Sequence, residues 1–131
     1  IRLEIERYRI NFQSSQEGFI RKWPTEYRLY GWLISMNSGG ELHPHIHENG
    51  WLSGSIYINV PSKTNFDSGS LVVALGKESD ATNSLQNSKK VMDVVTGSMA
   101  LFPASLMHHT IPFESDEERI VLAFDVIPKS H

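Results

Sequence analysis

The sequence has no cysteine among its 131 residues. Disulfide bonds, thiolate metal sites and cysteine nucleophiles are therefore excluded, and a reducing compartment is compatible with the composition. Long hydrophobic runs are also missing: no segment approaches the roughly 20 apolar residues that span a membrane, and no signal peptide is visible. We therefore expect a cytoplasmic protein without a membrane partner.

An excess of basic charge is absent as well. The formal net charge is −3 and the pI is about 6.1, whereas nucleic-acid-binding proteins usually carry a basic face. We expect no nucleic-acid partner. The length and the 40% hydrophobic content predict a single domain over residues 1–131 with one core. The first residue is not Met, which is compatible with the C-terminal part of a longer protein.

Short apolar segments between turn residues dominate the rest of the pattern, which predicts an all-β fold with a minor helical part, as a sandwich or barrel. One helix is expected near residues 14–22. The polar segment 77–90 has no periodicity and is typical of a long loop. Strands are expected at residues 30–36, 51–60, 69–76, 98–102 and 119–127, with a shorter candidate at 91–95.

Five of the six histidines fall in two groups, 43/45/47 and 108/109. On an extended strand, residues i and i+2 point to one face, so His45 and His47 can converge on a divalent metal. His43 precedes a proline that can interrupt strand pairing, and we expect it at the rim of the site. His108 and His109 should face opposite sides, so only one of them is expected to bind, and the pattern leaves open which.

Arg119 opens the last expected strand. Alternation places it on one face with Val121 and Ala123. Inside the mouth of a barrel, its guanidinium could hold a carboxylate through two parallel hydrogen bonds. The alternative is a surface arginine beside Glu117 and Glu118.

Three ordered motifs resemble the 2-oxoglutarate/Fe(II)-dependent oxygenases, in particular a bacterial and phage branch often attached to tetratricopeptide repeats. Residues 45–57 are similar to the family motif H-x-H-x-x-G-W-L-S-G-x-Y-Y. Residues 102–113 are similar to F-P-S-x-x-x-H-x-T-x-P-F, with Ala104 in place of the usual Ser. Residues 119–125 match R-x-x-x-A-F-D. The resemblance covers residues 27–128.

This resemblance implies a double-stranded β-helix (a cupin-like jelly-roll) that holds Fe(II) between its sheets and uses 2-oxoglutarate and O2. It assigns the distal iron ligand to His108 and the far carboxylate of 2-oxoglutarate to Arg119. It also places Tyr57 where related prolyl hydroxylases have a tyrosine that touches this carboxylate. Ser53 and Ser55 share the parity of Tyr57 and are expected to line the same interior, with Ser55 in the cosubstrate site. The family context also suggests an N-terminal repeat domain in the full-length chain.

The third ligand departs from the usual pattern. Most of these oxygenases use two histidines and one carboxylate, but the carboxylate position is occupied here by His47. One interpretation is a three-histidine site of His45, His47 and His108. In a second interpretation, water replaces the carboxylate, and His47 lies next to the ligands without binding the metal itself. In a third, His47 is the first ligand and Asn49 the second. We favour the three-histidine site.

The function predicted from these residues is the hydroxylation of a peptidyl or small-molecule substrate that the sequence does not specify. One alternative is a cupin-type three-histidine dioxygenase or isomerase that does not use 2-oxoglutarate. Another is a jelly-roll binding module without catalysis. A zinc hydrolase has the least support, because no recognised general-base carboxylate accompanies the histidines.

Overall fold

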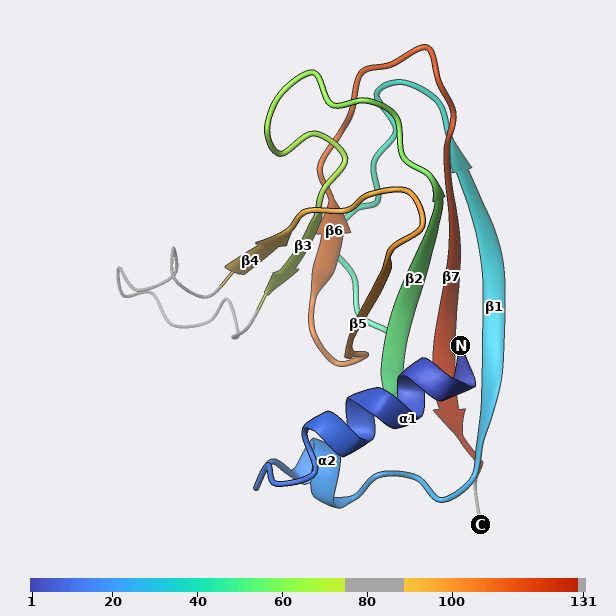
Figure 1. Cartoon of the computed structure of the whole chain (residues 1–131), viewed down its shortest axis with the longest axis vertical. Helices are drawn as coiled ribbons and strands as arrows, with labels where there is room; N and C mark the ends of the chain where they lie inside the picture. The colour runs from blue at the N-terminus through green and yellow to red at the C-terminus, as the bar shows by residue number, and fades with distance from the viewer. Residues whose placement is uncertain (75–88, 130–131) are drawn as a thin grey trace.

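Two antiparallel β-sheets form the body of the computed structural model, which describes residues 1–74 and 89–129 (Figure 1). The first sheet has the order β1-β7-β2-β5 and consists of β1 (Tyr27–Met36), β7 (Arg119–Pro128), β2 (Leu52–Asn59) and β5 (Met99–Pro103). The second sheet has the order β4-β3-β6 and consists of β4 (Lys89–Met92), β3 (Leu71–Ala74) and β6 (His108–Thr110). The predicted all-β jelly-roll class is confirmed.

The alternation of side chains gives the first sheet two different faces. One face meets the second sheet, and the core cluster between them includes Tyr57, Val73 and Val121. The other face carries Leu52 and Phe124, together with the other apolar residues of a second cluster. Because neighbouring residues of a strand point to opposite faces, β2 and β7 contribute to both cores and separate them.

Two short helices cover the outer face of the first sheet: α1 (Arg2–Asn11) and α2 (Gly18–Arg21). The predicted helix at 14–22 was too long, because α2 begins only at Gly18. Helix α1 was not predicted. It buries Ile5 completely, while its charged residues form exposed i,i+3 pairs and so resemble a solvated loop in the sequence. Within the described part of the chain, no helix is long and apolar enough to cross a membrane.

The edges of the second sheet differ from the prediction. Strand β4 begins two residues before the predicted segment 91–95 and overlaps it only at residues 91–92, and Val94 is buried in the core without being part of a strand. The predicted loop 77–90 ends inside β4, and its residues 77–88 lie outside the described residues. Strand β3 confirms the middle of segment 69–76, whose last two residues are also outside. Strand β6 has three residues, which is too short for a periodic signal.

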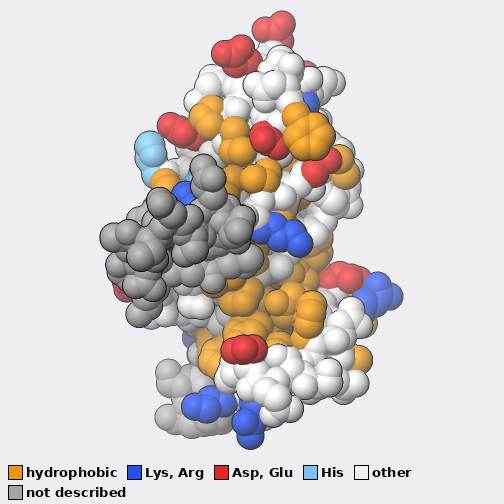
Figure 2. Space-filling model, turned by 90° about the vertical axis from the view of Figure 1, so that its left-hand side faces the viewer, with side chains coloured by type: hydrophobic (Ala, Val, Ile, Leu, Met, Phe, Trp, Pro, Cys, Tyr) orange, Lys and Arg blue, Asp and Glu red, His pale blue; other side chains and the backbone are white. Residues whose placement is uncertain are grey.

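Charge is distributed unevenly over the surface shown in Figure 2. Lys and Arg side chains are scattered on this side, whereas acidic side chains gather at the end where the β6–β7 connection lies. This connection contains four exposed acidic residues: Glu114, Asp116, Glu117 and Glu118. This end of the molecule is therefore acidic.

Candidate metal centre

Backbone pairing brings the two histidine groups together. His45 lies in the extended segment before β2 and forms an isolated bridge with His108 on β6, with N···O distances of 3.1 and 3.0 Å. The N–H of His47 donates to the carbonyl of Ala104 at 3.0 Å. The segment 45–47 is therefore extended, as predicted, although it belongs to no regular strand.

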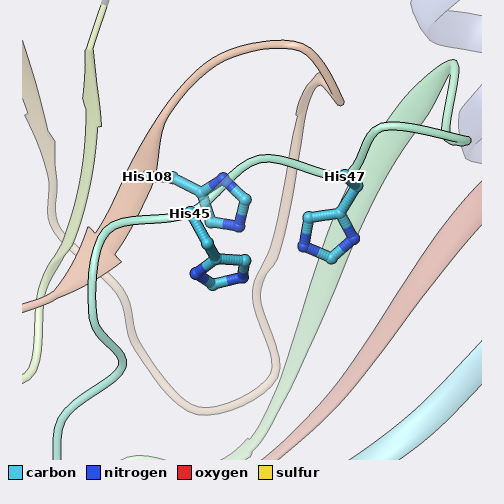
Figure 3. Close-up of side chains that lie close together, drawn as sticks. All are labelled: His45, His47 and His108. Carbon is cyan, nitrogen blue, oxygen red and sulfur yellow. The ribbon is translucent and has the colours of Figure 1, made fainter.

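The imidazoles of His45, His47 and His108 point toward one another (Figure 3). Their candidate ligand atoms all lie within 4.8 Å of one another. The ring centroids of His45 and His108 are 4.3 Å apart, and the ring of His47 is 5.0 Å from each of them. This spacing suits three nitrogen ligands around one divalent metal, which imidazoles bind at about 2.0–2.1 Å in the case of zinc.

Each ring is oriented by an oxygen atom next to its Nδ1. His45 Nδ1 lies 2.7 Å from the carbonyl of His43, and His108 Nδ1 lies 3.0 Å from that of Leu106. His47 Nδ1 lies 2.6 Å from Asp125 Oδ2. Carbonyl and carboxylate oxygens only accept hydrogen bonds, so each Nδ1 must carry the proton. In the neutral rings, all three Nε2 lone pairs are then free to bind a metal.

The neutral state of the His108 ring also favours metal binding. Burial lowers the pKa of His108 to about 4, and the Leu106 carbonyl opposes this shift only in part. The ring is therefore neutral at pH 7, which is the form that binds a metal. The Nε2 of His47 is buried and has no hydrogen-bond partner among the described residues. The donor set of this site fits a transition metal such as Fe(II).

Arg119 lines the same pocket as the three histidines. Only 3% of its surface is exposed. One guanidinium nitrogen donates to the carbonyl of Gly69 at 3.3 Å, and the buried Nε has no hydrogen-bond partner among the described residues. No acidic side chain forms an ion pair with it in the described ranges 1–74 and 89–129. A guanidinium in this setting is available to an anionic ligand.

Tyr57 and Ser55 complete this side of the pocket. The guanidinium carbon of Arg119 lies 5.5 Å from the centroid of the Tyr57 ring. Burial raises the pKa of Tyr57, whereas the charge of Arg119 and the Ser55 hydroxyl lower it. Burial also lowers the pKa of Arg119, but a guanidinium remains charged at neutral pH. The pocket wall thus presents a fixed cation beside a neutral phenol.

Other residues named from the sequence lie outside the group of three. His43 is exposed, and its contribution is the carbonyl that orients His45. His109 lies at the pocket but is not one of the three clustered imidazoles. Asn49 is exposed and does not line the pocket, so the geometry does not support the interpretation in which it replaces a ligand.

Sequence reasoning missed two neighbours of His47. Asp125 accepts a hydrogen bond from His47 Nδ1. Trp32 stacks on the His47 ring, with centroids 5.6 Å apart and an interplanar angle of 21°. The signal for Asp125 was present, because alternation from Arg119 places residue 125 on the inner face of the last strand. No comparable signal identified Trp32, since its contact depends on the pairing of β1 with β7.

A jelly-roll whose two sheets enclose a histidine group and a buried arginine defines a cupin-like protein with a candidate metal site. A family model described as "Putative 2OG-Fe(II) oxygenase" matches residues 30–125. The chain belongs to this family of 2-oxoglutarate- and Fe(II)-dependent oxygenases. Membership implies iron and 2-oxoglutarate as the associated metal and cosubstrate. No curated protein sequence matches the chain.

Several solved structures share the fold. A prolyl-4-hydroxylase from Pseudomonas putida has a TM-score of 0.57 and 17% identity, with 78% of this chain and 52% of that chain covered. HygX from Streptomyces hygroscopicus, solved with iron bound, has a TM-score of 0.56 and 15% identity, with 79% and 59% covered. An oxidoreductase of the 2OG-Fe(II) oxygenase family from Burkholderia pseudomallei has a TM-score of 0.56 and 14% identity, with 79% and 47% covered. The chain thus spans about half the length of these relatives.

Proposed function

We propose that this protein is an Fe(II)- and 2-oxoglutarate-dependent dioxygenase that hydroxylates a peptidyl or small-molecule substrate. The observation that carries the proposal is Arg119, a buried cation without an anionic partner among the described residues, in the pocket of the three histidines. Burial of an unpaired charge is costly, so such a residue is best explained by an anionic ligand.

His45, His47 and His108 are proposed as the ligands of Fe(II), each through its Nε2. Three protein ligands leave other coordination positions open for small molecules. When bound, the iron would supply the redox chemistry that couples decarboxylation of 2-oxoglutarate to succinate and CO2, in the presence of O2, with hydroxylation of a C–H bond.

The inner wall of the pocket would bind and orient the cosubstrate. Arg119 would hold the far carboxylate through parallel hydrogen bonds from its guanidinium. The neutral hydroxyl of Tyr57 would donate to the same carboxylate, and Ser55 would orient this hydroxyl. Both Arg119 and Tyr57 are almost fully buried, so water is excluded from this end of the cosubstrate and these interactions are strengthened.

The proposal extends to the domain organisation and the cellular compartment of the protein. We place the active unit in residues 1–131 as one oxygenase domain, attached to an N-terminal repeat domain in the full-length protein. The cytoplasm is the proposed compartment, because a cysteine-free chain does not depend on oxidising conditions.

The test is binding of 2-oxoglutarate to the Mn(II)-loaded protein without oxygen, measured by calorimetry for the wild type and Arg119→Ala. Loss of a buried charge partner typically costs about 2–5 kcal/mol, so the affinity should fall at least about 30-fold. The matched control is Arg28→Ala, which removes an exposed arginine of β1 and should leave binding unchanged. Equal binding by wild type and Arg119→Ala, or no succinate formed with Fe(II) and O2, would contradict the proposal.

A second candidate is a cupin-type dioxygenase that uses the three-histidine metal without 2-oxoglutarate. The observation in its favour is the ligand group itself, which contains no carboxylate. The same titration separates the two, because this candidate requires no 2-oxoglutarate binding in the wild type and assigns no role to Arg119.

A further inference from the structure

We propose that Asp125 is a positioning residue that supplies the metal centre with its negative charge through His47. The inference rests on the proposed role of His47 as a ligand. Asp125 Oδ2 accepts a hydrogen bond from His47 Nδ1 at 2.6 Å. Its second oxygen, Oδ1, accepts one from the hydroxyl of Ser53, also at 2.6 Å. Both carboxylate oxygens are therefore held, and one of them is directed at a candidate ligand.

The surroundings of Asp125 explain why this carboxylate needs a positive partner. It lies on the central strand β7, directly opposite Ser53 of β2, and 7% of its surface is exposed. Within the described ranges, neither a lysine nor an arginine forms an ion pair with it. An isolated buried carboxylate is costly. A cation bound at the other nitrogen of His47 would balance its charge.

Among the described residues, only one of the three histidines has a carboxylate as its hydrogen-bond partner. The rings of His45 and His108 donate to neutral backbone carbonyls, whereas His47 donates to Asp125. Residue 47 is also the position at which the two-histidine-one-carboxylate pattern has its anionic ligand. Three neutral imidazoles and one carboxylate behind His47 carry the same net charge as two imidazoles and one carboxylate. The arrangement thus keeps the charge of the usual site while moving it one imidazole away from the metal.

The orientation of His47 is held by more than this bond. Trp32 stacks on one side of the imidazole, and the backbone N–H of His47 is bound to Ala104. The ring therefore retains its place when the charge of Asp125 is removed by an isosteric substitution. An isosteric substitution therefore separates the electrostatic contribution of Asp125 from its contribution to the placement of the His47 ring.

The experiment measures binding of Co(II) alone to wild type and Asp125→Asn, by calorimetry and by the visible d–d absorption of the bound ion. Loss of a carboxylate behind a ligating histidine typically weakens metal binding by about 10–100-fold. We expect a loss in this range and a shift of the d–d bands. Asp116→Asn is the matched control, because it removes the same charge from an exposed side chain and should leave both readouts unchanged.

Ser53→Ala provides a second variant in case Asp125→Asn does not fold, which circular dichroism would show. It leaves the carboxylate in place but removes one of its two hydrogen bonds, so we expect a smaller loss of Co(II) affinity and a band shift in the same direction. A folded Asp125→Asn with wild-type affinity and spectrum, or an unchanged Ser53→Ala, overturns the inference. Wild-type protein that binds Co(II) but not 2-oxoglutarate overturns the proposed function instead.

Discussion

Arg119 and Tyr57 show how burial acts in opposite directions on two neighbouring residues. Burial lowers the pKa of the arginine and raises that of the tyrosine, and each residue partly offsets the shift of the other. At neutral pH the result is one cation and one neutral hydrogen-bond donor side by side. This combination matches the requirements of a carboxylate, which accepts hydrogen bonds and carries the opposite charge.

The raised pKa of Tyr57 predicts a specific loss of stability in alkali. The unfolded chain ionises this tyrosine near its ordinary value of 10.0, whereas the folded chain ionises it at higher pH. The unfolded state therefore binds fewer protons above pH 10, and the stabilising contribution is lost as the pH rises through the folded pKa. We expect the free energy of unfolding of the wild type to fall more steeply than that of Tyr57→Phe above pH 10, measured by urea titration at several pH values.

Tyr30→Phe is the control for this experiment. Tyr30 is 66% exposed, and its replacement should give the same slope as the wild type. Parallel curves for wild type and Tyr57→Phe would show that the phenol is not held in a desolvated site.

At the scale of single elements, strand β2 lines the pocket with two serines and packs against Phe124 through the glycine between them. Ser53 and Ser55 face the pocket, while Gly54 lies between them on the opposite face. Gly54 pairs with Phe124 of β7, whose ring occupies the space of the missing side chain. A Cβ at position 54 would lie 2.7 Å from Phe124 Cε1 and still closer to Cζ. The glycine therefore permits the aromatic ring to cover the strand.

Gly54→Ala should destabilise the protein by about 1–3 kcal/mol, because overpacking of a filled core forces side chains out of their preferred rotamers. The measurement is the free energy of unfolding from urea denaturation. Gly18→Ala is the control: a Cβ there meets nothing within 4 Å, and alanine favours a helix over glycine by up to about 1 kcal/mol. An equal effect of both substitutions would contradict the role given to the Phe124 ring.

At the scale of the whole molecule, the candidate ligands come from both sheets. His45 and His47 precede β2 of the first sheet, whereas His108 belongs to β6 of the second. The backbones of His45 and His108 are paired in a short bridge. A bound ion would thus join the two sheets at the pocket.

Metal addition should therefore stabilise the fold. A ligand that binds only the folded state contributes about 2.7 kcal/mol at a concentration of about 100 times Kd. We expect Mn(II) to raise the Tm of the wild type in a concentration-dependent way, and a chelator to reverse the increase. His45→Ala should abolish the response, whereas His43→Ala, which keeps the backbone carbonyl of an exposed residue, should preserve it. An equal response of both variants would exclude the three-histidine site.

Local patterns in the sequence predicted most of the framework. The long strands were identified because alternation and terminal prolines are local signals. The family resemblance assigned Arg119 and Tyr57 to the cosubstrate site, and strand parity added Ser55; all three residues line the pocket. Helix α1 was missed because its one fully buried residue, Ile5, gives a weak periodic signal. Alternation placed Asp125 on the inner face, but its role was missed because its hydrogen-bond partner His47 is 78 residues away.

The sequence by itself determined the long strands, the alternation of side chains along them and the family of the protein. Those properties depend on periodicity and on motifs within short stretches of chain. The tertiary structure decided that His108 meets His45, that the carboxylate of Asp125 is bonded to His47, and that Arg119 has no anionic partner among the described residues. These relations depend on strand order and register, which join residues far apart in the chain and follow from packing of the two sheets as a whole.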